Sequence, residues 1–207
     1  ACAPYRRLHL CDQHLSHMKA DKINTKHNLL LEVLLAAKYE GQSLVKKYNE
    51  YKKDNPHFDS NICTALARSF ADIGDIIRGK DLFIGYNEKD RKEKERLQQN
   101  LKKIFGKIYD KLGDEAQNHY NGDKKNNYFQ LREDWWEANR EAVWKAMTCE
   151  APNNAQYFRP TCGGDDNENT TIRTPNKCRC SDKPNTDPPT YFDYVPLYLR
   201  WFEEWAE

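Results

Sequence analysis

The stretch QLREDWWEANREAVWKAMTC, residues 130–149, decides the fold class. Its apolar residues recur at three- and four-residue spacing, which is the period of an α-helix. They form two neighbouring stripes, one with Leu131, Trp135, Ala138, Ala142 and Ala146 and one with Trp136, Val143 and Met147. A helix that is apolar on two faces packs against more than one neighbour, so this stretch predicts a buried helix in a helical core.

Three earlier stretches show the same spacing, and each carries helix start or stop residues. We expect helices over residues 26–53, from Asp59 or Ser60 to Gly79, and over residues 88–112. Aspartate and serine are common N-caps, and glycine commonly follows the last turn of a helix. The sequence therefore predicts four long helices in this part of the chain.

Two regions lack this periodicity. Residues 113–127 are polar and contain Asn-Gly-Asp, and residues 150–190 are rich in proline, glycine and cysteine, so we expect loops in both. A last helix is expected within residues 191–207, where an aromatic stripe is formed by Leu197, Tyr198, Trp201, Phe202 and Trp205. No stretch predicts a strand, and the expected fold class is all-α.

The composition limits the classes of protein. The 207 residues include 33 Lys and Arg and 32 Asp and Glu, which excludes the uniformly basic surface of a dedicated nucleic-acid-binding protein. Mean hydropathy is -1.02, and no apolar run is long enough for a membrane span. No motif of a nucleophile elbow, metalloprotease or phosphate-binding loop occurs. We predict neither an enzyme nor a bound cofactor.

Seven cysteines are typical of an extracellular domain with disulfides. The spacing of Cys149, Cys162, Cys178 and Cys180 would by itself allow four thiolates to hold zinc, but structural zinc sites favour two CxxC pairs and only a CxC occurs. We therefore predict disulfides and no metal. A CxC pair rarely closes on itself, so Cys178 and Cys180 are expected to reach different partners, for example Cys63 and either Cys149 or Cys162.

The expected helix over residues 88–112 carries a row of basic residues beside its apolar stripe. The row consists of Lys92, Arg96, Lys103, Lys107 and Lys111. Regularly spaced cations suit a linear polyanion such as a sulfated polysaccharide. The alternative is a solvated helix face, which Glu88, Glu93 and Glu95 support. Arg6 and Arg7 form a further candidate anion-binding spot.

Five blocks of sequence resemble one known family. They read ACAPYRRLHLCD at residues 1–12, LLLEVLLAAKYEG at 29–41, LARSFADIGDIIRGKDLF at 66–83, LREDWWEANREAVWKAMTC at 131–149 and YFDYVPLYLRWFEEWAE at 191–207. In this order they closely resemble the Duffy-binding-like α domain of the variant erythrocyte membrane protein 1 family of malaria parasites.

The resemblance implies a helical adhesion fold of three subdomains, with long loops held by disulfides. Residues 1–25 would be part of an irregular first subdomain, residues 26–190 the helical second, and residues 191–207 the start of a third that is truncated here. Cys2 and Cys11 resemble cysteines that pair with partners upstream. Cys63 resembles one that bonds to Cys178 or Cys180.

The resemblance also implies host-cell adhesion from the extracellular face of the infected erythrocyte membrane, as part of a membrane-anchored multidomain protein. The implied partners are heparan-sulfate-like glycosaminoglycans, blood-group glycans or complement receptor 1, together with adjacent domains of the same protein. Rosetting, antigenic variation in the loops and recognition by host antibodies are expected with it. The alternative is a scaffold that supports a neighbouring receptor-binding cysteine-rich interdomain region.

Overall fold

The computed structural model describes residues 2–18, 22–23, 25–55, 61–157, 159–163, 171–180 and 187–206. Within them the chain is mostly helical. The elements in chain order are α1 (Tyr5–Leu8), α2 (Gln13–Ser16), α3 (Lys26–Asp54), α4 (Ile62–Arg78), α5 (Glu88–Asp110), α6 (Asp114–His119), η1 (Asp123–Asn126), α7 (Phe129–Met147), β1 (Cys162–Gly163), β2 (Thr171–Ile172), η2 (Phe192–Tyr194) and α8 (Leu197–Ala206).

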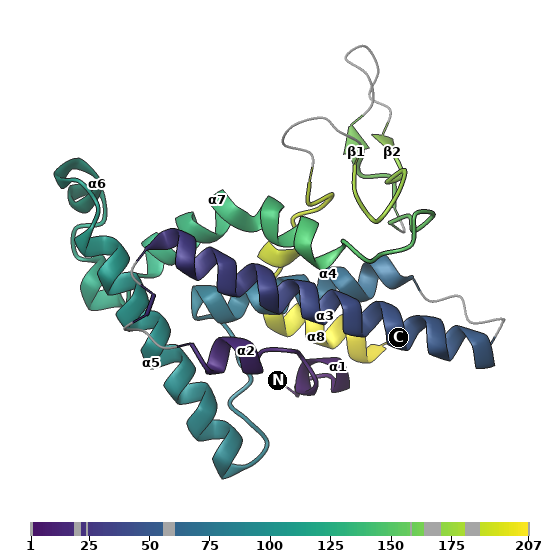
Figure 1. The fold of residues 1–207 in the computed structure, drawn as a ribbon, viewed down its shortest axis with the longest axis horizontal. Coiled ribbons are helices and arrows are strands. Elements are labelled where there is room, and N and C mark those ends of the chain that lie inside the picture. The colour runs from purple at the N-terminus through teal and green to yellow at the C-terminus, as the bar shows by residue number, and fades with distance from the viewer. Residues whose placement is uncertain are drawn as a thin grey trace.

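The long helices pack around α4. Figure 1 shows α3 and α4 side by side across the middle of the molecule, with α7 on one side and α8 on the other. Helix α4 is buried over nearly its whole length, from Ile62 to Arg78. Helix α5 leaves this layer at a steep angle and contacts α7 and α2. One continuous apolar core therefore joins the α3–α4–α7 layer to α5.

The tryptophans of α7 form the centre of the core, as their spacing predicts. Trp136 and Trp144 are almost fully buried and lie on either side of Phe70, with ring centroids 5.1 and 5.3 Å away. Helix α3 reaches α7 closely because residue 41 is glycine: a Cβ on Gly41 would lie 1.9 Å from the carbonyl oxygen of Met147. Backbone contact at this crossing leaves no room for a side chain.

Three of the long helices, α3, α4 and α5, follow a polar residue that caps them. The side chains of Thr25, Asn61 and Asn87 accept hydrogen bonds from backbone N–H groups of α3, α4 and α5. Asp59 and Ser60, the expected caps of the second helix, lie outside the described residues. Gly79 ends α4 in the left-handed conformation, with φ 77°.

The expectation of a loop over residues 113–127 is wrong, because this region contains α6 and η1. Acidic residues Asp114 and Glu115 stabilise the first turn of α6. Asp123 is buried and accepts hydrogen bonds from the backbone N–H groups of Gln130 and Leu131 at 3.1 and 3.0 Å. The segment thus serves as an N-terminal cap for α7.

The expectation of no strands is also wrong, although only for two short ones. Strands β1 and β2 pair antiparallel, with Cys162 opposite Ile172. Two disulfides hold this region: Cys63 of α4 bonds to Cys178, and Cys162 bonds to Cys180. Their sequence separations are 115 and 18 residues, so the first ties the irregular segment to the helical core and the second closes a local loop.

The last helix, α8, packs Leu197 and Trp201 inward against the layer. Its other aromatic side chains are exposed, with Phe202 at 74% and Trp205 at 60%. The indole N–H of Trp205 donates to the carbonyl oxygen of Cys2 at 3.1 Å. None of the helices in the described ranges is long and apolar enough to cross a membrane.

Candidate functional site

The basic row predicted from sequence lies on the outer edge of α5. We call Lys92, Arg96, Lys103, Lys107 and Lys111 the α5 ridge. Arg96, Lys103 and Lys111 are exposed, and Lys107 is half-buried. Leu97, Leu101 and Ile104 on the opposite face of the helix are buried in the core. The structure therefore keeps the charged edge of α5 at the surface.

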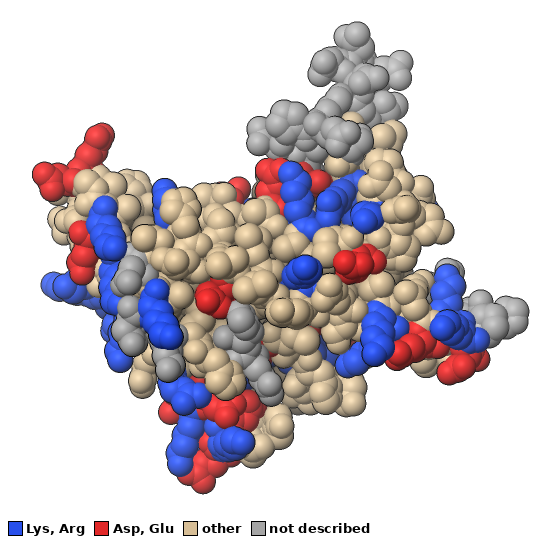
Figure 2. Space-filling model, in the orientation of Figure 1, with Lys and Arg blue, Asp and Glu red and all other residues tan. Residues whose placement is uncertain are grey.

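Charge is distributed unevenly along the α5 ridge. Residues 88–95 carry four acids and four bases, whereas residues 96–111 carry one acid and five bases. At the N-terminal end Lys92 is 72% exposed and pairs with Glu88 at 2.8 Å. Figure 2 shows Lys and Arg along this edge of the molecule, with carboxylates mixed among them near the start of α5. The C-terminal half therefore carries the net positive charge.

The prediction that Arg6 and Arg7 form an external anion-binding site is wrong. Arg7 is 1% exposed: it pairs with Asp81 and with Asp12, and its guanidinium lies 4.8 Å from the centre of the Phe83 ring. Arg6 pairs with Asp72 at 2.9 Å and Glu204 at 2.8 Å. Both arginines form ion pairs with carboxylates of the same chain, so neither is available to an external anion.

Arg6 belongs to a buried network of charges that we call the buried joint. It consists of Arg6, Asp72, Asp75, Arg78, Arg200 and Glu204. Arg200 of α8 pairs with Asp72 at 3.0 Å and Asp75 at 2.6 Å, both on α4. The joint links α1, α4 and α8.

A related cluster lies between α7 and η2. Asp193 is 1% exposed, and its carboxylate accepts from the Trp136 indole at 2.8 Å and from Arg140 Nε at 3.0 Å. Arg140 therefore serves a structural purpose like the arginines of the buried joint.

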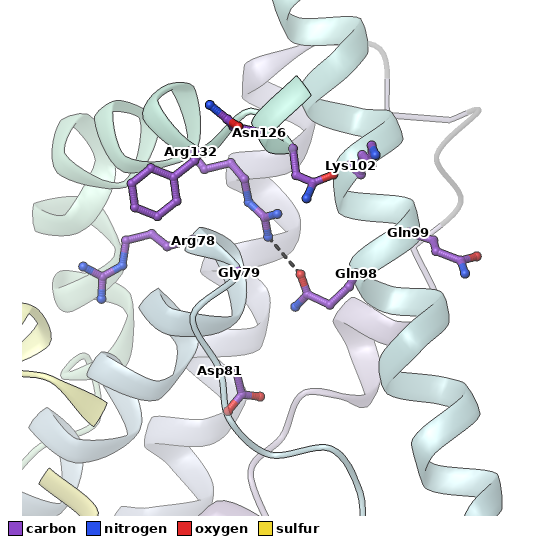
Figure 3. A pocket seen from close by; sticks show the side chains of 10 residues that line it. Arg78, Gly79, Asp81, Gln98, Gln99, Lys102, Asn126 and Arg132 are labelled. Atoms are coloured by element: carbon purple, nitrogen blue, oxygen red, sulfur yellow. Dashed lines mark hydrogen bonds between the residues drawn. The ribbon is translucent and has the colours of Figure 1, made fainter. Parts of the chain in front are cut away.

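A cavity of about 400 Å³ opens between the end of α4, the middle of α5, and the segment from η1 to α7 (Figure 3). It lies on the flank of α5 that carries Lys102. The side chains lining it are mostly polar: Arg78, Asp81, Gln98, Gln99, Lys102, Asn126, Asn127 and Arg132, with Gly79 and Phe129.

Sequence reasoning missed this cavity, since its residues come from four separate elements. One signal was present: Arg132 precedes Trp136 by four residues and so falls on the second apolar stripe of α7. A charged residue on an apolar stripe is buried with it, and Arg132 is 4% exposed.

The cysteines do not form a metal site among the described residues. Cys162, Cys178 and Cys180 form disulfides, so these residues cannot hold zinc through four thiolates. Cys149, also a disulfide candidate, is a free thiol, because the structure uses Cys162 as the partner of Cys180. Cys2 and Cys11 are free thiols in this structure as well.

Comparison with known proteins places the chain in a family. The family model of the Duffy binding domain matches residues 1–200. The gamma form of the Duffy receptor of Plasmodium knowlesi is 27% identical over 172 residues, which are 79% of this chain and 13% of the receptor. The Duffy receptor of Plasmodium vivax is 27% identical over 155 residues, 70% of this chain and 12% of the receptor. The chain thus spans about an eighth of the length of these relatives.

Solved structures support the same assignment. The NTS-DBL1α-1 domain of Plasmodium falciparum membrane protein 1 (PfEMP1), varO strain, is 48% identical with a TM-score of 0.80, covering 100% of this chain and 43% of that chain. A PfEMP1 DBLβ domain bound to ICAM-1 is 37% identical with a TM-score of 0.69, covering 100% and 44%. Erythrocyte binding antigen 140 of Plasmodium falciparum, in complex with sialyllactose, is 25% identical with a TM-score of 0.55, covering 98% and 25%.

The family match, the helical fold and the similarity to PfEMP1 domains agree with one another. The chain belongs to the Duffy binding domain family and has a DBL-like fold.

Proposed function

We propose that this chain is a host-cell adhesion domain that binds sulfated glycosaminoglycans, such as heparan sulfate, through the α5 ridge. The observation that carries the proposal is the excess of five bases over one acid along residues 96–111. Four of these bases belong to the α5 ridge, on the edge of the helix that faces away from the core. Arg96 and Lys103, the central members, have exposed side chains and lie two helical turns apart.

The physics of such a contact is electrostatic. A row of cations on a linear polyanion releases condensed counterions, so affinity falls steeply with added salt. By analogy with nucleic acids, five such contacts reduce affinity about 100- to 500-fold between 50 and 200 mM salt. A strong salt dependence is therefore the signature of the α5 ridge.

Similar proteins make this biological setting reasonable. One DBLβ relative was solved bound to ICAM-1, and one more distant relative was solved with sialyllactose. Both ligands show that related domains hold protein or glycan partners. Display on the infected erythrocyte, with rosetting as the outcome, is part of our proposal, as are blood-group glycans and complement receptor 1 as further partners.

The test is binding of the oxidised chain to immobilised heparin across a salt series. Reversing Lys103, Lys107 and Lys111 to glutamate should preserve the circular dichroism spectrum and reduce both the affinity and the salt slope. The matched control reverses three exposed lysines of α3, Lys38, Lys46 and Lys53, for the same change in net charge. Equal losses in the two triple variants would show that only net charge matters and would reject the α5 ridge as the site.

A second candidate function is support of a neighbouring domain. Phe202, Trp205 and Tyr198 expose large aromatic surfaces on α8, with 56% of Tyr198 accessible. A relative was solved as a DBL1α and CIDRγ double domain, and we propose such an interdomain region as the partner. This alternative predicts no heparin binding at low salt and quenching or a blue shift of Trp205 fluorescence when the interdomain region is added.

A further inference from the structure

Arg132 is a buried guanidinium without a carboxylate partner among the described residues. Its Nε donates to the carbonyl oxygen of Ile77 at 2.6 Å. Its Nη2 donates to the carbonyl oxygen of Ile76 at 3.3 Å and to Gln98 Oε1 at 3.0 Å. The bonds to Ile76 and Ile77 cap C-terminal carbonyls of α4, which explains the position of the side chain. The charge of Glu133 acts on the guanidinium but forms no ion pair with it.

The remaining nitrogen of Arg132 faces the cavity. Nη1 forms no hydrogen bond with the parts of the chain that the structure describes, and it is not among the fully enclosed polar atoms. A Cβ on Gly79 would lie 2.9 Å from Nη1, so the glycine keeps this side of the guanidinium uncovered. Glu133, the adjacent acid, instead pairs with Lys80 at 2.5 Å.

The other charges around the cavity are mostly neutralised. Asp81, the one carboxylate among its described lining residues, pairs with Arg7. Arg78 pairs with Asp75 at 2.8 Å. Arg132 and the exposed Lys102 are then the two lining cations that form no ion pair with any residue in the described ranges. Burial lowers the pKa of Arg132 to about 10, which is the sign of a charge that a bound anion would stabilise.

Neutral hydrogen-bonding groups complete the lining. Side-chain amides of Gln98, Asn126 and Asn127 belong to the lining and offer donors and acceptors. In Figure 3 the amide of Gln98 points toward Arg132, whereas that of Gln99, also a lining residue, points away from it. Phe129 adds an aromatic ring that is 47% exposed. Cations, amides and one ring suit a ligand that carries an anionic group and several hydroxyls. The volume of about 400 Å³ is at the lower end of the range for small-molecule sites.

We propose that this cavity binds one anionic sugar residue, whose carboxylate or sulfate lies between Arg132 and Lys102 and whose hydroxyls contact the amides of Gln98, Asn126 and Asn127. The inference deepens the proposed function and in that respect depends on it: the α5 ridge would hold the polyanion by charge, and the cavity on the other flank of α5 would select a single sugar unit.

The probes are the methyl glycoside of glucuronic acid, glucose 6-sulfate and neutral methyl glucoside. Each is titrated into the ¹⁵N-labelled, oxidised chain while the side-chain amide signals of Gln98, Asn126 and Asn127 and the Nε signal of Arg132 are followed by NMR. We expect saturable shifts of these signals with one or both anionic probes and none with the neutral sugar. The two anionic probes distinguish a carboxylate site from a sulfate site.

Two neighbouring lysines of α5 provide a matched pair of variants. Lys102→Gln should weaken binding of the small anionic probe at least fivefold, whereas Lys103→Gln on the α5 ridge should leave it within twofold. Because both side chains are exposed, neither variant threatens the fold. Arg132→Lys keeps the charge but removes Nη1, and its binding is read only after circular dichroism shows a folded chain.

The outcomes separate the two proposals. Absence of saturable shifts at millimolar probe, or equal losses in the Lys102→Gln and Lys103→Gln variants, overturns the cavity even if heparin still binds the α5 ridge. Saturable probe binding that Lys102→Gln alone weakens supports the cavity, and it does so even in a chain that fails to bind heparin, which would reject the α5 ridge only.

Discussion

Basic residues in the buried joint and on the α5 ridge have opposite surroundings. Arg200 and Arg78 are at most 2% exposed and contact carboxylates of α4, whereas Arg96 and Lys103 have exposed side chains. In the sequence, the Arg6-Arg7 pair and the lysines of α5 look equally suited to bind an anion. A basic cluster therefore stays accessible to an external anion only where no internal carboxylate pairs with it.

The largest expected effect follows from removing a buried acceptor. Asp193→Ala would leave Arg140 and the Trp136 indole unpaired inside the protein, which costs about 3–5 kcal/mol of the free energy of unfolding. Urea denaturation measures it. Asp193→Asn retains an acceptor oxygen and should lose less. A loss below about 1 kcal/mol in the alanine variant would mean that water replaces the carboxylate and that the cluster is not sealed.

The next effect concerns the thiol of Cys11, beside the buried joint. Burial raises the pKa of Cys11 to about 12, and Glu40 adds to the shift. The folded chain therefore keeps the proton while the unfolded chain releases it near pH 9, so this thiol contributes stability below pH 9 that is lost between pH 9 and 12. At pH 9, alkylation should be at least about a hundredfold slower in the native chain than in urea.

A chain with Cys2 and Cys149 replaced by serine isolates the Cys11 reaction. Equal alkylation rates with and without urea would show that the Cys11 thiol is accessible to solvent in the native chain. The region around Cys11 would then be less buried than the structure shows.

A smaller effect is expected at the rim of the buried joint. Arg6→Gln removes the pairs with Glu204 and Asp72, but Asp72 retains Arg200, so the loss should be about 1–3 kcal/mol. Thermal or urea unfolding measures it. Heparin affinity of the folded variant should not change. A large drop in that affinity would show that Arg6 contacts heparin, and the buried joint and the α5 ridge would then no longer differ in their access to an external anion.

The smallest effects are expected from single changes on the α5 ridge. Lys103→Gln should lower heparin affinity about two- to fivefold, as expected for an exposed ion pair, and shift stability by less than about 0.5 kcal/mol. Lys92→Gln should lower it less, because Glu88 already pairs with Lys92. Salt-dependent heparin binding compares the two. A greater loss at Lys92 would place the polyanion at the other end of α5.

The contrast also shows how far the sequence alone reaches. Trp135, Trp136 and Trp144 predict α7 because helical periodicity is local, and the structure confirms that helix with ends shifted by one or two residues. Segments α6 and η1 were missed because they are too short to show periodicity. The internal ion pairs of Arg6 could not be predicted, because its partners Asp72 and Glu204 are far from it in the sequence.

The same limit applies to the cavity. Gln98 and Lys102 lie on the flank of a helix whose apolar stripe was visible, but Arg78, Asn126 and Arg132 reach that flank only after three other segments pack. Composition and spacing describe single elements. A site assembled from several of them is determined by tertiary contacts, which one sequence without structure does not contain.

The hydrogen bond from the Trp205 indole to the carbonyl oxygen of Cys2 has a practical consequence. The two residues are 203 positions apart in the sequence, yet the bond brings α8 to the segment just before α1. A thiol-reactive fluorophore on Cys2 would therefore accept energy from Trp205 only while the two segments stay together, so its emission would report on their separation during unfolding.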